Sequence, residues 1–220
     1  AGRARWRQHS TFVVQHNKHW DEDLLKLPSV EVLQEVSDWE RAAEIGFGAV
    51  VWDAAIDMCH LVEASCTSGQ ASGGEEGHFW SGKHVLELGA GCGAAGLTVA
   101  TKGAKVTLTD RSCVLSLLEK NIQQNALQAH ACALALDWAV ATPEDFMTES
   151  RRPFDVVLGA DIISVDPDRD LSKDIFHALR HALQTLLAGD ENVLVLLAFQ
   201  ERGPIELQAL GALFSPLIGA

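Results

Sequence analysis

The chain has 220 residues, of which 47% are hydrophobic, and a formal net charge of −13. This length predicts a single main domain with one sizeable core, and no apolar run reaches the roughly 18–20 residues that a membrane-spanning helix needs. The acidic balance argues against a nucleic-acid partner, because binding a phosphate backbone requires a basic surface. The five cysteines are scattered and form no CxxC pair. They predict reduced thiols, no metal site, and a location in the cytoplasm, with the nucleus as a second compartment.

In chain order, we expect an N-terminal extension over residues 1–45 and a main domain over residues 46–220. A segment rich in Gly and Trp opens this domain and includes Gly46, Gly48 and Trp52. The Ser- and Gly-rich stretch Ser65–Gly77 follows and is predicted to be a loop that separates this segment from the main sheet.

Short runs of Val, Leu and Ala, each bounded by polar or turn residues, predict strands that are buried on both faces of a parallel sheet. These runs are His84–Leu88, Lys105–Thr109, Ala131–Leu136, Phe154–Ala160 and Asn192–Phe199. Between them, apolar residues repeat every three or four positions from Val114 to Ile122 and from Leu171 to Leu187, as in amphipathic helices. Strands alternating with helices predict an α/β fold with a Rossmann-like, doubly wound and mostly parallel sheet.

A glycine-rich loop follows the first of these strands directly. It reads Gly89-Ala90-Gly91-Cys92-Gly93 and continues into the small residues that open a helix. Glycine is needed where a side chain would keep a ligand from lying against the turn, and a helix start offers unpaired N–H groups. The next strand ends at Asp110, 21 residues after Gly89, a distance that suits a carboxylate accepting hydrogen bonds from two ribose hydroxyls. The pattern predicts a nucleotide-like ligand.

Two ligands compete for this loop. Residues 91–96 satisfy the GxGxxG pattern of nicotinamide dinucleotide sites, but that motif alone is weakly specific. Glu87 precedes the first glycine by two residues and gives the ExGxGxG form of S-adenosylmethionine sites. A carboxylate can face the cationic methionyl part of that cofactor, whereas it would repel a pyrophosphate. We therefore expect S-adenosylmethionine.

Together with this loop and Asp110, the segments AVVWDAA (Ala49–Ala55) and LGADII (Leu158–Ile163) resemble the methyltransferase 21 family of seven-β-strand protein-lysine methyltransferases. The resemblance covers about Asp38 to Phe199 and is strongest to members that methylate heat-shock chaperones. It implies the class I methyltransferase fold and S-adenosylmethionine as cofactor. It also implies a protein substrate that bears a lysine, such as a chaperone, and neither nucleic acid nor membrane as partner. We expect a monomer.

The resemblance also implies cofactor contacts, at Trp52, Gly89, Ala90, Gly91, Asp110, Trp138 and Ala160, to which the loop pattern adds Glu87. Trp52 can cover a sulfonium with its aromatic face, although a tryptophan of the core is an equally simple interpretation. Trp138 and Ala160 follow or end predicted strands, where ligands of open α/β sheets bind. Asp161 comes next and is the candidate catalytic residue.

The sequence departs from the family pattern at two places. Ser164 stands where a tyrosine usually follows the aspartate by three residues, and the chain contains no tyrosine. A helix is possible over Ile205–Phe214, after which only residues 215–220 remain, so we expect the C-terminal strand pair to be missing. Two alternatives stay open: a methyltransferase for small molecules or nucleic acids, and an inactive cofactor-binding protein. No Asn-Pro-Pro-aromatic motif follows the fourth strand to favour the former.

Overall fold

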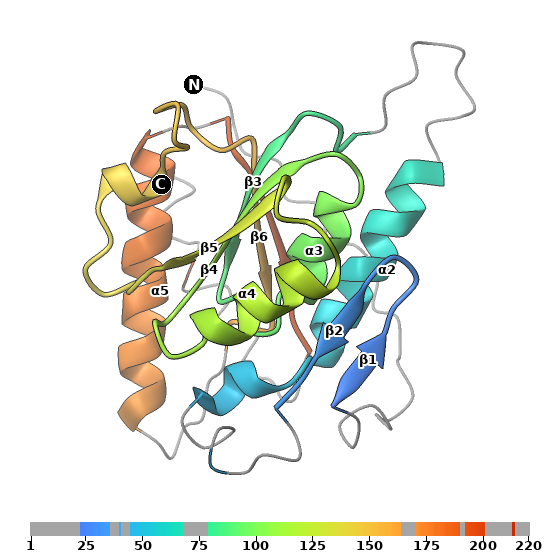
Figure 1. The fold of residues 1–220 in the computed structure, drawn as a ribbon. Coiled ribbons are helices and arrows are strands. Elements are labelled where there is room, and N and C mark those ends of the chain that lie inside the picture. The colour runs from blue at the N-terminus through green and yellow to red at the C-terminus, as the bar shows by residue number, and fades with distance from the viewer. Residues whose placement is uncertain are drawn as a thin grey trace.

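A computed structural model describes residues 23–35, 40, 45–67, 79–163, 170–189, 192–200 and 213 (Figure 1). Its main sheet has five parallel strands in the order β5-β4-β3-β6-β7. Their bounds are His84–Leu88 for β3, Lys105–Asp110 for β4, Ala131–Ala135 for β5, Val156–Ala160 for β6 and Leu194–Ala198 for β7. All five predicted strands are confirmed, with ends that shift by at most two residues.

Strand β3 lies at the centre of the sheet, where the direction of winding reverses. The chain moves outward from β3 through β4 to β5, then crosses to the other side of β3 to form β6 and β7. Leu88, the last residue of β3, is level with Thr109 of β4 and Gly159 of β6, so the carboxyl ends of the three strands meet at one edge. Ligands of open α/β sheets bind at such a reversal point.

Helices cover both faces of this sheet (Figure 1). Helices α2 (Asp53–Thr67), α3 (Ala94–Ala100) and α4 (Leu115–Gln124) enclose one core, while α5 (Asp170–Gly189) and the 3-10 turn η4 (Pro143–Phe146) enclose the other. The doubly wound α/β fold is thus confirmed. Helix α2 extends to Thr67, so the beginning of the predicted Ser/Gly loop is helical; residues 68–78 lie outside the described part.

Part of the predicted N-terminal extension belongs to the same folded unit. Strands β1 (Leu24–Lys26) and β2 (Glu31–Leu33) form an antiparallel hairpin that packs on α4 (Figure 1). Its apolar side chains join the core beneath α4, so this part of the extension is integral to the fold. Residues 1–22 lie outside the described residues. The five cysteines are all free thiols, as predicted. Within the described ranges, no helix is long and apolar enough to cross a membrane.

Glu87 joins β3 to helix α3. Its side chain is only 2% exposed, and its Oε2 accepts a hydrogen bond from the backbone N–H of Gly96 at 2.9 Å. A Cβ atom on residue 96 would collide with this carboxylate and with Leu108, which explains why a glycine occupies the helix there. Burial raises the pKa of Glu87 to about 8, with a further contribution from the nearby negative charge of Asp110.

This raised pKa predicts a specific pH dependence of stability. A carboxyl group whose pKa is higher in the folded than in the unfolded protein stabilises the fold below its unfolded pKa, and this contribution is lost as the pH rises through the folded pKa. The ordinary value is 4.5 and the folded value about 8. Relative to Glu87→Gln, whose amide still accepts from Gly96, the wild-type free energy of unfolding should therefore decrease between about pH 5 and about pH 8.

Urea unfolding at several pH values measures this difference. Glu63→Gln is the control: burial raises the pKa of Glu63, but hydrogen bonds from Lys102 and Ser29 outweigh it and leave the pKa below its ordinary value. Its difference from the wild type should stay constant over the same interval. If the difference in free energy of unfolding between the wild type and Glu87→Gln also stayed constant, the raised pKa of Glu87 would be contradicted.

Candidate cofactor site

The glycine loop adopts a backbone conformation that side chains disfavour. Gly89, Gly91 and Gly93 have φ values of 61°, 54° and 81°, in the left-handed region where glycine has no steric penalty. Space is also short, because a Cβ on Gly89 would lie 3.1 Å from Trp138 Cζ2 and one on Gly93 would lie 2.9 Å from Leu118 Cδ2. The left-handed backbone and the lack of space explain why this loop requires glycine, as the sequence predicted.

Asp110 holds the loop from the end of β4. Its Oδ2 accepts a hydrogen bond from the Gly91 N–H at 2.8 Å and its Oδ1 accepts one from the Arg111 N–H at 2.7 Å. Burial raises the pKa of Asp110, and these two bonds and the Arg111 charge oppose the increase. Each carboxylate oxygen retains a lone pair for a further donor. Asp110 can thus hold the loop and still accept hydrogen bonds from two ribose hydroxyls.

The 3-10 turn η2 (Gly46–Ala49) packs on the outside of the same loop. A Cβ on Gly91 would lie 3.5 Å from Gly48 Cα, and the Cys92 thiol donates to the Gly48 carbonyl at 3.4 Å. Arg111 fixes the turn through a bond from Nη2 to the Ile45 carbonyl at 2.6 Å. The sequence drew attention to Gly48 but indicated no role for it, and Arg111 was not predicted as a site residue. The position of Arg111 directly after Asp110 could have indicated that it lies near the site.

Trp52 lies beside this turn. Its indole Nε1 donates to the Phe47 carbonyl at 2.8 Å, and the two rings stand 6.1 Å apart. The Trp52 side chain is half-buried and belongs to neither hydrophobic core, so the interpretation of Trp52 as a core residue is wrong. The bond fixes the Trp52 ring against the turn that packs on the glycine loop, and contact of Trp52 with a cofactor stays a prediction.

Trp138 contributes a polar atom that the described residues leave unsatisfied. Its ring packs over Gly89 together with Ile162, a residue that sequence reasoning missed. The indole Nε1 is buried and has no hydrogen-bond acceptor within the described part of the chain. A buried donor without a partner costs about 1–3 kcal/mol. A ligand acceptor at this edge would satisfy it, so the residues present fit a nucleoside cofactor.

Ala160 and Asp161 complete the edge at the end of β6. Asp161 has a φ of 55°, which is uncommon outside glycine and is tolerated best by Asn and Asp. Its N–H donates to the Ala198 carbonyl at 2.8 Å, and its Oδ1 accepts from the Gln200 N–H at 3.5 Å. Asp161 is half-buried and directly follows the small Ala160, and its place at the mouth of the site stays a prediction. Ser164 lies outside the described residues.

One predicted site residue needs correction. Glu87 was expected to face the cationic part of the cofactor, but its carboxylate is buried beneath α3, where it binds the Gly96 N–H. The physical reason is strand alternation: Glu87 is in phase with Val85, whose side chain packs in the core on the α3 side. Glu87 therefore positions the helix after the loop, whereas Gly89–Gly91, Asp110 and Ala160 lie at the carboxyl ends of β3, β4 and β6.

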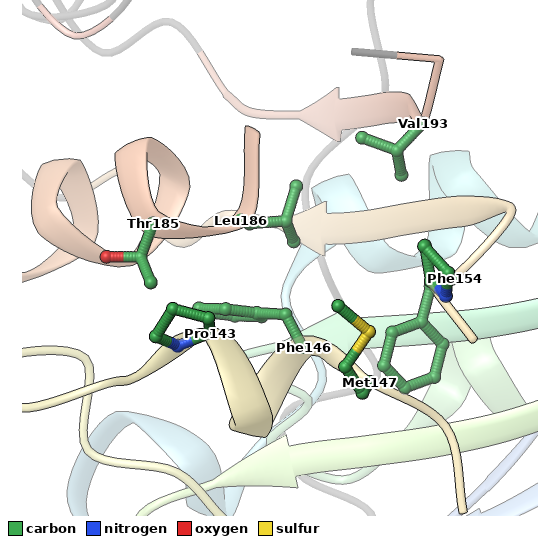
Figure 2. A pocket seen from close by; sticks show the side chains of 8 residues that line it. Pro143, Phe146, Met147, Phe154, Thr185, Leu186 and Val193 are labelled. Atoms are coloured by element: carbon green, nitrogen blue, oxygen red, sulfur yellow. The ribbon is translucent and has the colours of Figure 1, made fainter. Parts of the chain in front are cut away.

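A separate hollow lies at the opposite edge (Figure 2). It is partly open and is lined by Pro143, Phe146, Met147, Pro153, Phe154, Thr185, Leu186 and Val193. Phe154 and Val193 stand just before β6 and β7, at the amino ends of these strands. Since the lining contains no titratable group, this hollow does not extend the candidate site.

Comparison with known proteins identifies the family to which the chain is similar. A family model described as lysine methyltransferase matches residues 33–213. Protein N-lysine methyltransferase METTL21A of Danio rerio is 34% identical over 161 residues, covering 72% of this chain and 62% of the relative. EEF1A lysine methyltransferase 3 of Xenopus tropicalis is 37% identical over 122 residues, covering 55% of this chain and 47% of the relative.

This chain thus spans about half to three-fifths of the length of these curated relatives. Residues 33–213, which the family model matches, nevertheless include the glycine loop, Asp110 and all five strands of the main sheet. These matches confirm the resemblance to the methyltransferase 21 family. The chain belongs to the lysine methyltransferase family.

Proposed function

We propose that this chain binds S-adenosylmethionine and transfers its methyl group to the ε-amine of a lysine in another protein. Membership of the lysine methyltransferase family supports both the cofactor and the acceptor. The observation that carries the proposal is the convergence of the glycine loop, Asp110 and the unsatisfied Trp138 indole at one edge of the sheet.

Bound S-adenosylmethionine supplies an electrophilic methyl carbon on a positive sulfonium. The residues of this chain would hold it as follows. Asp110 accepts from the ribose hydroxyls, the loop backbone from Gly89 to Gly91 lies against the ligand, and the Trp138 N–H donates to it. Alignment of the reacting groups is the main contribution of such a site, and ideal geometry can lower a barrier by about 7–11 kcal/mol.

We propose that Asp161 acts on the acceptor amine. A lysine amine has an ordinary pKa near 10.4 and must be neutral to attack a methyl carbon. The desolvation and positive charge met beside a sulfonium lower that pKa. The Asp161 carboxylate can accept N–H bonds from the amine and so orient its lone pair. Asp161 directly follows Ala160, the last residue of β6.

For the acceptor protein, one relative is named for lysine methylation of EEF1A, and the sequence resemblance favours a chaperone. A net charge of −13 is compatible with a basic, lysine-bearing surface. We further propose that the chain acts as a monomer in the cytoplasm and also in the nucleus, where its five free thiols would stay reduced.

The acceptor residue is directly testable. Incubation of the chain with isotopically labelled S-adenosylmethionine and a cell lysate should place label on a protein, and tandem mass spectra should locate the added methyl on a lysine. A reaction without the chain is the control. Label on arginine, histidine or a nucleotide would refute the proposed acceptor, and no label above the control would favour an inactive cofactor-binding protein.

Asp161→Asn tests the role of the carboxylate. Asparagine has the same size and tolerates the left-handed backbone, while the negative charge and one acceptor oxygen are lost. We expect turnover to fall by about tenfold to a hundredfold because the amine is less well aligned. The dissociation constant for S-adenosylhomocysteine should remain unchanged in calorimetry. Asp174→Asn, which changes an exposed carboxylate on α5, is the matched control. Wild-type turnover in Asp161→Asn would show that the Asp161 carboxylate does not orient the acceptor amine.

A further inference from the structure

A buried amide on α4 links the N-terminal hairpin to the cofactor loop. Asn121 is 0% exposed, and each part of its side chain has a backbone partner. Its Oδ1 accepts from the Leu33 N–H at 2.7 Å, and its Nδ2 donates to the Leu33 carbonyl at 3.0 Å and to the Cys92 carbonyl at 2.9 Å. Leu33 belongs to β2, whereas Cys92 lies between the glycines of the loop. One side chain therefore binds both segments.

Asn125 repeats the first half of this arrangement one helical turn later. Its Oδ1 accepts from the Glu31 N–H at 2.8 Å, and its Nδ2 donates to the Glu31 carbonyl at 2.7 Å and to the Asn121 carbonyl at 2.8 Å. Four residues of helix advance by about 6 Å and two residues of strand by about 6.6 Å, so the two spacings match. The two amides thus occupy the place of a neighbouring strand along the free edge of β2, but only Asn121 reaches the loop.

A second chain of contacts leads from the hairpin to Trp52. Directly after β2, the Gln34 side chain accepts from the Val51 N–H at 2.7 Å, and the Glu35 N–H donates to the Ala49 carbonyl at 2.9 Å. These bonds fix the residues between the turn η2 and Trp52. The hairpin end therefore contacts the segment that leads to Trp52, while Asn121 alone connects the hairpin to the loop.

We propose that Asn121 is a positioning residue for S-adenosylmethionine binding, because its one amide holds the loop at Cys92 and thereby couples the loop to the N-terminal hairpin at Leu33. Asn121 would act through Cys92 and Leu33 and not by touching the ligand. The inference rests on the proposed function, because it assigns Asn121 to the cofactor site proposed above. A purely structural Asn121 would stabilise the fold without affecting the affinity of the folded protein.

Asn121→Asp and Asn125→Asp form a matched pair for the test. Each keeps the size and the acceptor oxygen but loses two N–H donors; only at position 121 is a donor to the loop lost. Both variants should lower Tm. At a temperature where circular dichroism shows both to be folded, calorimetry should find S-adenosylhomocysteine bound about tenfold more weakly by Asn121→Asp, since a buried loop carbonyl faces a carboxylate. Binding by Asn125→Asp should stay within about threefold of the wild type.

Hydrogen exchange of the wild-type chain supplies a second measurement that does not depend on folding of the variants. Coupling between two sites is reciprocal, so saturation with S-adenosylhomocysteine should slow amide exchange over Glu31–Leu33. Wild-type affinity in Asn121→Asp, equal losses in the two variants, or unchanged exchange over Glu31–Leu33 would each overturn the inference alone. A wild-type chain that binds no S-adenosylhomocysteine would instead refute the proposed function.

Discussion

The rest of the site depends on two hydrogen bonds, in which acidic side chains accept from the glycine loop and from the helix that follows it. Asp110 binds the Gly91 N–H from one side, and Glu87 binds the Gly96 N–H from beneath the following helix. The two carboxylates extend from β3 and β4, which are neighbouring parallel strands in fixed register. The sheet therefore sets where the loop lies, and the absence of side chains at Gly89 and Gly91 lets neighbouring segments pack directly against the loop backbone.

Segments from distant parts of the sequence pack around this loop, because its glycines leave room for them. The turn η2 approaches Gly91, whereas Trp138 and Ile162 approach Gly89. Each of these glycines thus permits close packing as well as a left-handed backbone. A cofactor at this edge would meet contributions from the ends of β3, β4, β5 and β6, so the doubly wound topology is what assembles the site.

Much of this arrangement could be predicted because it depends on local pattern. The apolar runs predicted the strands of the main sheet, and the glycine loop with Asp110 at the next strand end predicted the ligand class. Glu87 was misplaced because β3 is buried on both faces, and its sequence does not indicate which face carries α3. Asn121 escaped notice for another reason. A polar residue on an amphipathic helix is expected at the surface, yet Asn121 pairs with a strand 88 residues away. Nothing in the local sequence reveals that partner.

Calorimetry can test whether the glycine loop and Asp110 form a site for S-adenosylmethionine. The wild-type chain and Asp110→Asn are each titrated with S-adenosylhomocysteine and with NAD. We expect the wild type to bind S-adenosylhomocysteine and not NAD. Asp110→Asn should bind S-adenosylhomocysteine about tenfold to a hundredfold more weakly, since hydrogen bonds to a charged group contribute about 1.5–3 kcal/mol. Heat with NAD and none with S-adenosylhomocysteine, or equal affinity of the two proteins for S-adenosylhomocysteine, would contradict this site.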